Sequence, residues 1–237
     1  THVDSSAASD VYKRQIVMNG DLITTVDVQD MLSHHVKSDS LVSISLWPVE
    51  DPTRFGVADF DQKKGLIRRF QEKPSLEEAY SNLINAGCYI IETSVIQGLS
   101  TEFHSMERDV FPGIAESGRM GGYRYSGRFI DAGTPTSYLE AMVAAIEDNS
   151  FNIGGIVGTS WYADPKMSKK GIENSAVGMG CKLGDGIRVN RSAILEGARI
   201  GENVHLDNCL IGRGSMVPAN SRLVDMVIGF NQQYQRK

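Results

Sequence analysis

The chain has 237 residues, of which 41% are hydrophobic, so it can bury a core in one large domain or two small ones. Its formal net charge is −5, without a basic run, which argues against nucleic acid or an anionic membrane surface as a partner. The three cysteines are odd in number and lack metal-ligand spacing, and no apolar run could span a membrane, so we expect a cytoplasmic protein without a disulfide framework.

The first fifteen residues carry no periodicity of a helix or a strand. Residues 1–15 are small and polar, then basic, and they meet an apolar run at Ile16 without an intervening turn. We interpret them as a foreign segment that does not belong to the fold, with a genuine disordered arm as the alternative.

The next stretch is an apolar run that begins at Ile16 and ends in Asn19-Gly20-Asp21. If this run is a buried strand, the Asp21 carboxylate lies at its carboxyl end, where open α/β sheets bind their ligands. The competing interpretation is a hairpin turn, in which the same carboxylate would be solvated. Asp21 is therefore a candidate metal ligand whose case depends on a second carboxylate elsewhere in the chain.

A helix and a second strand follow. Apolar spacing predicts a helix over residues 27–37, capped by Asp27, and β-branched alternation predicts a strand over residues 41–49. A helix between two strands forms a βαβ crossover, which predicts a mostly parallel sheet. His34 and His35 are adjacent on the helix and point about 100° apart, so they cannot readily share a metal ion, and we expect both at the surface.

A predicted hairpin leads to the tripeptide Glu72-Lys73-Pro74. Two apolar runs, residues 55–60 and 66–70, flank a polar loop that ends in glycine. Because Pro74 favours an extended backbone at the residue before it, we expect Glu72 and Lys73 to project to opposite sides of the chain. On its own, the tripeptide is also compatible with a charged surface loop.

Residues 83–91 form another predicted strand, which contains Asn85-Ala86-Gly87. A glycine inside a strand marks either a close approach of a ligand to the backbone or a bulge. A helix predicted over residues 105–116 should kink or end near Pro112, and we interpret Glu107 as a structural acid in its first turn.

The pattern of an apolar run that ends in an aspartate near a glycine, first seen at Asn19-Gly20-Asp21, recurs where a short predicted strand ends in Asp131-Ala132-Gly133. Thr134 can cap the helix that begins at Pro135. Asp21 and Asp131 would then be two strand-terminal carboxylates on one sheet, the kind of pair that holds Mg²⁺ together with substrate phosphates. The recurrence favours the metal interpretation of Asp21 over the turn.

The carboxy-terminal part is repetitive. One apolar position recurs every 17 residues, at Val177, Ile194, Ile211 and Ile228. Inward positions six, six and five residues apart are typical of a parallel β-helix of hexapeptide repeats, here three coils long. We therefore predict an α/β domain over residues 16–150, a linker over residues 151–176 and a β-helix over residues 177–237.

Six motifs occur in order along the chain, and the series is more specific than any one of them. They are Asn19-Gly20-Asp21, Asp51-Pro52-Thr53-Arg54-Phe55-Gly56-Val57, Glu72-Lys73-Pro74, Ile84-Asn85-Ala86-Gly87, Glu107-Arg108-Asp109-Val110-Phe111-Pro112 and Asp131-Ala132-Gly133-Thr134-Pro135. From Ile16 to about Asn149 the chain resembles the sugar-1-phosphate nucleotidyltransferases, and among them the mannose-1-phosphate guanylyltransferases. The resemblance implies a truncated Rossmann-like α/β domain followed by a left-handed β-helix.

The resemblance also implies a reaction. In this family a sugar 1-phosphate oxygen attacks the α-phosphate of a nucleoside triphosphate, here GTP, and pyrophosphate leaves. It implies that Asp21 and Asp131 hold Mg²⁺ between the phosphates, that Lys73 pairs with the sugar phosphate, and that Glu72 accepts hydrogen bonds from sugar hydroxyls. The sugar pocket would be shaped by Gly56, Asn85 and Gly87.

Two features depart from the family pattern. The family opens with a glycine-rich loop of the form Gly-x-Gly-Thr-Arg-Leu that cradles the triphosphate, and nothing like it precedes Ile16. We therefore expect the nucleotide half of the site to be absent and the chain to have little or no transferase activity. Arg128-Phe129 stands where the family usually has an aromatic pair, a departure that concerns the local sugar contacts.

Two other functions compete with this one. Hexapeptide acyltransferases use a histidine base on a β-helix coil, but His205 directly precedes the inward Leu206 and should face outward. A non-catalytic regulatory paralogue would instead bind sugar nucleotides and a partner. By family resemblance, the β-helix could also join subunits into a homo-oligomer.

Overall fold

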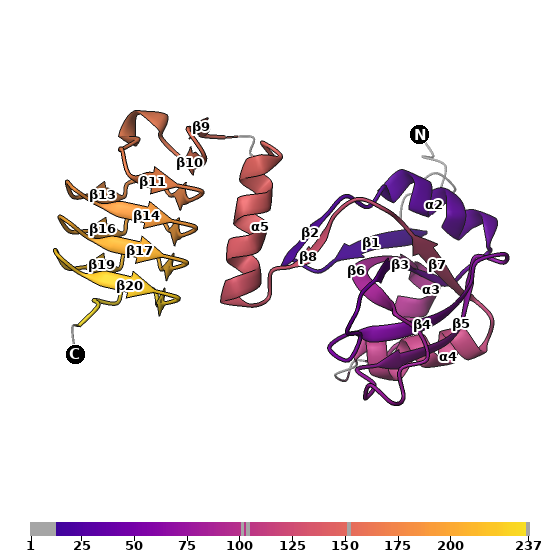
Figure 1. Ribbon diagram of the computed structural model, residues 1–237. Helices are drawn as coiled ribbons and strands as arrows, with labels where there is room; N and C mark the ends of the chain where they lie inside the picture. The colour runs from indigo at the N-terminus through magenta and orange to yellow at the C-terminus, as the bar shows by residue number, and fades with distance from the viewer. Residues whose placement is uncertain (1–12, 101, 103–104, 151–152, 236–237) are drawn as a thin grey trace, which may run out of the picture. The chain divides into compact units, whose positions relative to one another are not determined.

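The computed structural model of the protein describes residues 13–100, 102, 105–150 and 153–235. The chain divides into two compact units, residues 1–129 and residues 130–237 (Figure 1). Each unit has its own hydrophobic core. Within the described ranges, no helix has both the length and the apolar composition needed to cross a membrane.

The first unit is built on a six-stranded sheet. Its strands lie in the order β1 (Arg14–Met18), β6 (Leu83–Glu92), β3 (Val42–Pro48), β7 (Met120–Arg124), β5 (Leu66–Glu72) and β4 (Gly56–Asp61). The predicted mixed sheet is confirmed, but the predicted excess of parallel pairs is wrong. Among the described strands of this sheet, β3 and β7 are a parallel pair, and the remaining pairs are antiparallel. Because β6 lies between β1 and β3 and runs against both, these two point the same way without pairing.

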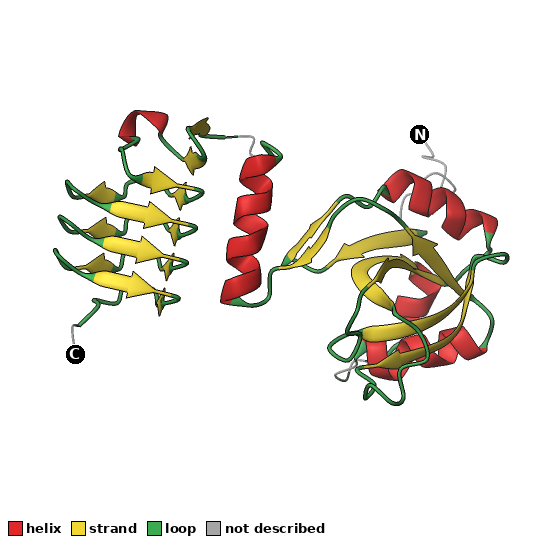
Figure 2. Ribbon diagram, viewed as in Figure 1, coloured by secondary structure: helices red, strands yellow, loops and turns green. Residues whose placement is uncertain are grey.

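Helices cover both faces of this sheet, and alternation along β6 divides the core between them (Figure 2). On one face, Cys88 and Ile90 pack with Met31 of α2 (Val28–Lys37). On the other, Tyr89 packs with Phe111 of α4 (Phe111–Glu116), and α3 (Thr93–Gln97) adds two partly buried residues. The cap predicted for α2 is confirmed, since the side chain of Asp27 accepts hydrogen bonds from two backbone amides of its first turn.

The helix predicted over residues 105–116 is in two pieces. A π-helix, η1 (Met106–Val110), is followed directly by α4 (Phe111–Glu116). The predicted interruption near Pro112 is confirmed, because a proline lacks the amide hydrogen and is tolerated in the first turn of a new helix. The Ser105 hydroxyl caps η1 by accepting a hydrogen bond from the Arg108 amide at 3.3 Å.

Strand β1 is an exposed edge strand, and its predicted burial is wrong. Ile16, Val17 and Met18 are 52%, 39% and 46% exposed, because β1 ends the sheet and pairs with β6 alone. The strand also begins at Arg14, two residues earlier than the apolar pattern suggested, and Arg14 Nε donates to Glu92 Oε1 at 2.8 Å. Residues 1–12 of the predicted foreign segment lie outside the described residues.

The prediction that both histidines of α2 face solvent is wrong for His35, which is 1% exposed. Its Nδ1 lies 2.8 Å from Ser43 Oγ, and its Nε2 lies 3.0 Å from Glu92 Oε1. Adjacent helix positions differ by about 100°, so the same turn that exposes His34 directs His35 toward the sheet. The burial is tolerated because both ring nitrogens find partners, which are distant in sequence.

The second unit contains the predicted parallel β-helix (Figure 1). One stack consists of β10 (Ser160–Tyr162), β12 (Ala176–Val177), β15 (Ala193–Ile194), β18 (Leu210–Ile211) and β21 (Val227–Ile228), with β9 (Gly155–Val157) antiparallel at its edge. A second stack consists of β11 (Ile172–Glu173), β14 (Arg188–Asn190), β17 (His205–Asp207) and β20 (Arg222–Val224). A third consists of β13 (Lys182–Leu183), β16 (Arg199–Ile200) and β19 (Met216–Val217). The pairing of Val177 with Ile194 and of Ile194 with Ile211 confirms the 17-residue register.

The coils begin before Val177, inside the stretch predicted to be a linker. Residues 153–176 already contain β9, β10, the short 3-10 helix η2 (Pro165–Met167) and β11. Ile172 keeps the 17-residue step to its partner Val189, but Tyr162 lies only 15 residues before its partner Val177. This shortening hides the first coil from a search for a fixed repeat.

Helix α5 (Pro135–Glu147) belongs to the second unit. Its predicted cap is confirmed, since Thr134 Oγ1 accepts a hydrogen bond from the Ser137 amide at 3.2 Å. Its apolar face, which includes Leu139 and Met142, packs against Ala193 of the β-helix. The sequence placed this helix in the α/β domain, because amphipathic spacing reveals an apolar face but not the element that covers it.

Candidate functional site

Six polar side chains from four segments of the first unit are here termed the polar cluster. They are Asn19, Glu72, Lys73, Asn85, Tyr89 and Glu107. Hydrogen bonds join Asn85, Tyr89 and Glu107, an ion pair joins Lys73 to Glu72, and the charges of Glu72 and Glu107 interact. The cluster brings together three of the predicted site residues, Glu72, Lys73 and Asn85, and the predicted glycines Gly56 and Gly87 lie directly beside it.

Gly56 makes room for the Glu72 carboxylate. The two residues pair across β4 and β5, and a Cβ added at Gly56 would lie 2.9 Å from Glu72 Oε2 and collide with the ring of Phe70. Burial raises the pKa of Glu72 above its usual value and nearby Glu107 raises it further, while Lys73 opposes the shift. A partly desolvated carboxylate of this kind gains free energy when hydroxyl groups donate hydrogen bonds to it.

Lys73 does not project away from Glu72 as predicted. Its backbone has a φ of +47°, and its Nζ lies 3.7 Å from Glu72 Oε1. The Lys73 amide donates to the carbonyl of Phe55 at 3.0 Å, and this bond holds the backbone against the extended preference that Pro74 imposes. A left-handed backbone at a residue other than glycine is strained, and such strain is concentrated at functional sites.

Gly87 brings the Asn19 turn against β6. It has a φ of +68°, its carbonyl accepts a hydrogen bond from the Asn19 amide at 2.9 Å, and a Cβ there would lie 2.8 Å from Asn19 Nδ2. The Gly87 amide donates to Asn85 Oδ1 at 3.0 Å. The β3–β6 register shifts across the stretch that contains Gly87, which confirms the bulge alternative, and the space beside the glycine is filled by Asn19, a residue of the motif that contains Asp21.

Tyr89 and Glu107 complete the cluster, although neither was predicted to belong to the site. Asn85 Nδ2 donates to the Tyr89 hydroxyl at 3.0 Å, and that hydroxyl donates to Glu107 Oε1 at 3.3 Å. Burial raises the pKa of Tyr89 well above its usual value. Strand alternation was the signal that could have found Tyr89, because residues 85, 87 and 89 share one face of a strand.

The two predicted metal ligands fall in different units. Asp21 lies in an exposed turn between β1 and β2 (Leu22–Thr24), and its carboxylate has no hydrogen bond or ion pair among the described residues. Asp131 ends β8 (Phe129–Asp131), and its Oδ1 accepts a hydrogen bond from the Gly133 amide at 3.0 Å. In the described part of the chain, no three His, Cys, Asp or Glu side chains form a group that could hold a metal ion. The pairing of Asp21 with Asp131 stays a prediction.

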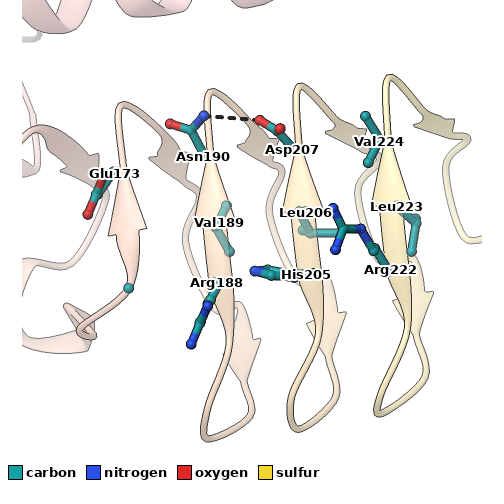
Figure 3. A pocket seen from close by; sticks show the side chains of 11 residues that line it. Glu173, Arg188, Val189, Asn190, His205, Leu206, Asp207, Arg222, Leu223 and Val224 are labelled. Carbon is teal, nitrogen blue, oxygen red and sulfur yellow. Dashed lines mark hydrogen bonds between the residues drawn. The ribbon is translucent and has the colours of Figure 1, made fainter.

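A second polar surface lies on the β-helix, where a groove of about 360 Å³ crosses β11, β14, β17 and β20 (Figure 3). Arg188, His205 and Arg222 occupy equivalent positions on successive coils, and Asn190 Nδ2 donates to Asp207 Oδ1 at 3.0 Å. The prediction that His205 faces outward is confirmed, because it lines this groove while Leu206 is buried. Among the described residues no acid pairs with its ring, which leaves a role as catalytic base without support.

Comparison with known proteins divides the chain in a similar way. Residues 4–148 match the family model described as nucleotidyl transferase, and residues 147–237 match the one described as GlmU-like, C-terminal hexapeptide. A mannose-1-phosphate guanyltransferase beta-A of Xenopus laevis is 32% identical over 126 residues, which cover 53% of this chain and 34% of that protein. A probable mannose-1-phosphate guanylyltransferase 3 of Oryza sativa subsp. japonica is 27% identical over 185 residues, covering 74% of this chain and 51% of that protein. The chain therefore spans between a third and a half of the length of these relatives.

Proposed function

Because the chain belongs to the nucleotidyl transferase family, we propose that its polar cluster binds a sugar 1-phosphate, with mannose 1-phosphate as the preferred sugar. The names of its relatives support this substrate. The single observation that carries the proposal is the convergence of Glu72, Lys73 and Asn85 on one cluster of the first unit.

The chemistry of the cluster suits both parts of this ligand. The Lys73 ammonium is more than half exposed and can pair with the phosphate, while the Glu72 carboxylate can accept hydrogen bonds from the sugar hydroxyls. Asn85 offers the remaining hydrogen of its amide as a donor. In the reaction, the sugar-phosphate oxygen forms a bond to the α-phosphate of GTP as the bond to pyrophosphate breaks.

Magnesium fits the kind of donors that are present. Within the described ranges, Asp21 presents a carboxylate without a partner, and Asp131 keeps one oxygen outside its hydrogen bond with Gly133. Mg²⁺ prefers carboxylate oxygens and takes its other ligands from phosphates and water. When bound, it would neutralise phosphate charge, and Asp21 and Asp131 are each a proposed carboxylate ligand for it.

Transfer itself requires a cradle for the triphosphate. The 237 residues contain no Gly-x-Gly-Thr-Arg-Leu sequence, so a polypeptide with this sequence alone should bind the sugar phosphate but release little pyrophosphate from GTP. The same behaviour is expected of a regulatory paralogue.

The three buried cysteines of this chain, free of disulfides, are compatible with the reducing cytoplasm as its compartment.

Calorimetry with mannose 1-phosphate tests the proposal. Lys73→Ala should weaken binding about tenfold, the effect of losing one hydrogen bond to a charged group. Lys64→Ala, which removes an exposed lysine of the β4–β5 loop, is the matched control and should bind like the wild type. Equal affinities of the wild type and Lys73→Ala would refute the assignment.

We also propose that the β-helix groove pairs two copies of the chain. Its cationic row (Arg188, His205 and Arg222) lies beside a row formed by Glu173, Asn190 and Asp207. If a two-fold axis runs parallel to the axis of the β-helix, the cationic row of each copy faces the acidic row of the other, as an isologous interface requires. The hexapeptide character of residues 147–237 supports this assembly.

A further inference from the structure

Glu107 lies outside every contact proposed above for the sugar phosphate, yet it ends a chain of hydrogen bonds that begins at Asn85. The chain runs from the Gly87 amide to Asn85 Oδ1 at 3.0 Å, and from Asn85 Nδ2 to the Tyr89 hydroxyl at 3.0 Å. It continues from that hydroxyl to Glu107 Oε1 at 3.3 Å. The two interior side chains, Asn85 and Tyr89, therefore each have one defined neighbour on each side.

The two ends of this chain fix its direction. A backbone amide can only donate a hydrogen bond and an ionised carboxylate can only accept one, whereas a hydroxyl and a carboxamide can do both. With Gly87 as the donor at one end and Glu107 as the acceptor at the other, the Tyr89 proton must point to Glu107. Asn85 must then turn its NH₂ group toward Tyr89 and its oxygen toward Gly87.

Two further contacts prevent Tyr89 from reversing. Its side chain is 4% exposed, and its ring packs against Phe111 with centroids 5.5 Å apart, so the hydroxyl cannot turn to bulk water. The side chain of Asn19 also lowers the pKa of the Tyr89 phenol, which is the effect of a donor near its oxygen. Because the Asn85 amide donates to the Tyr89 oxygen, the hydroxyl has its proton left for Glu107.

The π-helix η1 puts Glu107 within reach. Glu107 is the second residue of η1, and its other carboxylate oxygen accepts a hydrogen bond from the Ser105 hydroxyl at 3.3 Å. Because π-helical turns are rare and often occur at functional sites, this local geometry supports a role beyond helix capping.

We propose that Glu107 is a positioning residue that, through Tyr89, holds the Asn85 carboxamide in the orientation that the Gly87 amide also requires. The free Asn85 N–H is thereby held as a donor toward the sugar. This role rests on the proposed sugar-phosphate site, but the orientation of Asn85 is a property of the unliganded chain. The two can therefore be tested separately.

Solvent exchange of the Asn85 side-chain amide, measured by NMR on the ¹⁵N-labelled full chain, tests the orientation. Glu107→Ala and Tyr89→Phe should each speed this exchange about fivefold or more, as expected when a hydrogen bond of ordinary strength is lost. Glu107→Gln keeps an acceptor oxygen and should restore most of the protection. Glu116→Gln, an exposed change in α4, is the matched control.

Affinity for mannose 1-phosphate supplies the second readout, with about a fivefold loss expected in Glu107→Ala and recovery in Glu107→Gln. Wild-type exchange rates in both Glu107→Ala and Tyr89→Phe would overturn the positioning role, whatever the affinities. If the wild type does not bind mannose 1-phosphate while the exchange rates change as expected, the positioning role holds and the proposed substrate fails.

Discussion

Replacing Gly87 by alanine should destabilise the first unit and displace the Asn19 turn. The φ of Gly87 is +68°, a conformation that costs an L-residue about 1–2 kcal/mol. The new Cβ would also lie 2.5 Å from Leu22 Cδ1 and 2.8 Å from Asn19 Nδ2, closer than ordinary van der Waals contact, so both side chains must move. We expect the free energy of unfolding to fall by about 2–4 kcal/mol in total.

A second glycine separates the two contributions. Gly65 has a φ of +70°, but a Cβ added there would have no atom within 4 Å. Gly65→Ala therefore carries the backbone cost of about 1–2 kcal/mol without the collision. The difference between the two variants measures the packing of Asn19 and Leu22 against β6.

Urea unfolding followed by tryptophan fluorescence provides the measurement. The chain has two tryptophans, Trp47 in the first unit and Trp161 in the second, so a Trp161→Phe background reports on the first unit alone. Gly87→Ala should also weaken mannose 1-phosphate binding, whereas Gly65→Ala should not. Equal losses of stability and unchanged binding in both variants would refute the argument that Gly87 positions Asn19.

Three further outcomes are expected. Ile194→Ala, which empties a fully buried site of the β-helix, should cost about 2–5 kcal/mol in urea unfolding, while Val227→Ala at a half-exposed site should cost under about 1 kcal/mol. Burial lowers the pKa of His35, so the unfolded chain takes up its proton more readily, and the urea midpoint of the first unit should fall as the pH drops through about 6.5. His35→Gln should flatten that dependence; an unchanged slope would contradict it. In sedimentation experiments, Asp207→Arg should dissociate the proposed dimer, and the added change His205→Glu should restore it; a wild type that sediments as a monomer would dismiss the interface.

The repeats and caps were predictable because their signals are local. The 17-residue step of the β-helix depends on identical neighbours stacking, so the register of Val177, Ile194 and Ile211 can be counted along the chain. Asp27 and Thr134 cap their helices through bonds to amides two or three residues away. The β4–β5 hairpin likewise closes over a short loop and is confirmed by its antiparallel pairing.

Features that depend on distant partners were not predictable. The burial of His35 needs Ser43 and Glu92, and the left-handed backbone of Lys73 needs the carbonyl of Phe55. The antiparallel insertion of β6 between β1 and β3 depends on a strand that follows both in sequence. In each case the local preference was real, but a long-range hydrogen bond or pairing outweighed it.

By itself, the sequence determined the family, the repeat and which residue types carry the candidate chemistry: a glutamate, a lysine and an asparagine in fixed motifs. Only the tertiary structure decided that these side chains share one cluster, that Tyr89 joins them, and that Glu107 lies at its end. The physical reason is that a motif specifies residue types and local backbone, whereas the direction of a hydrogen-bond chain depends on which donors and acceptors the fold brings to its two ends.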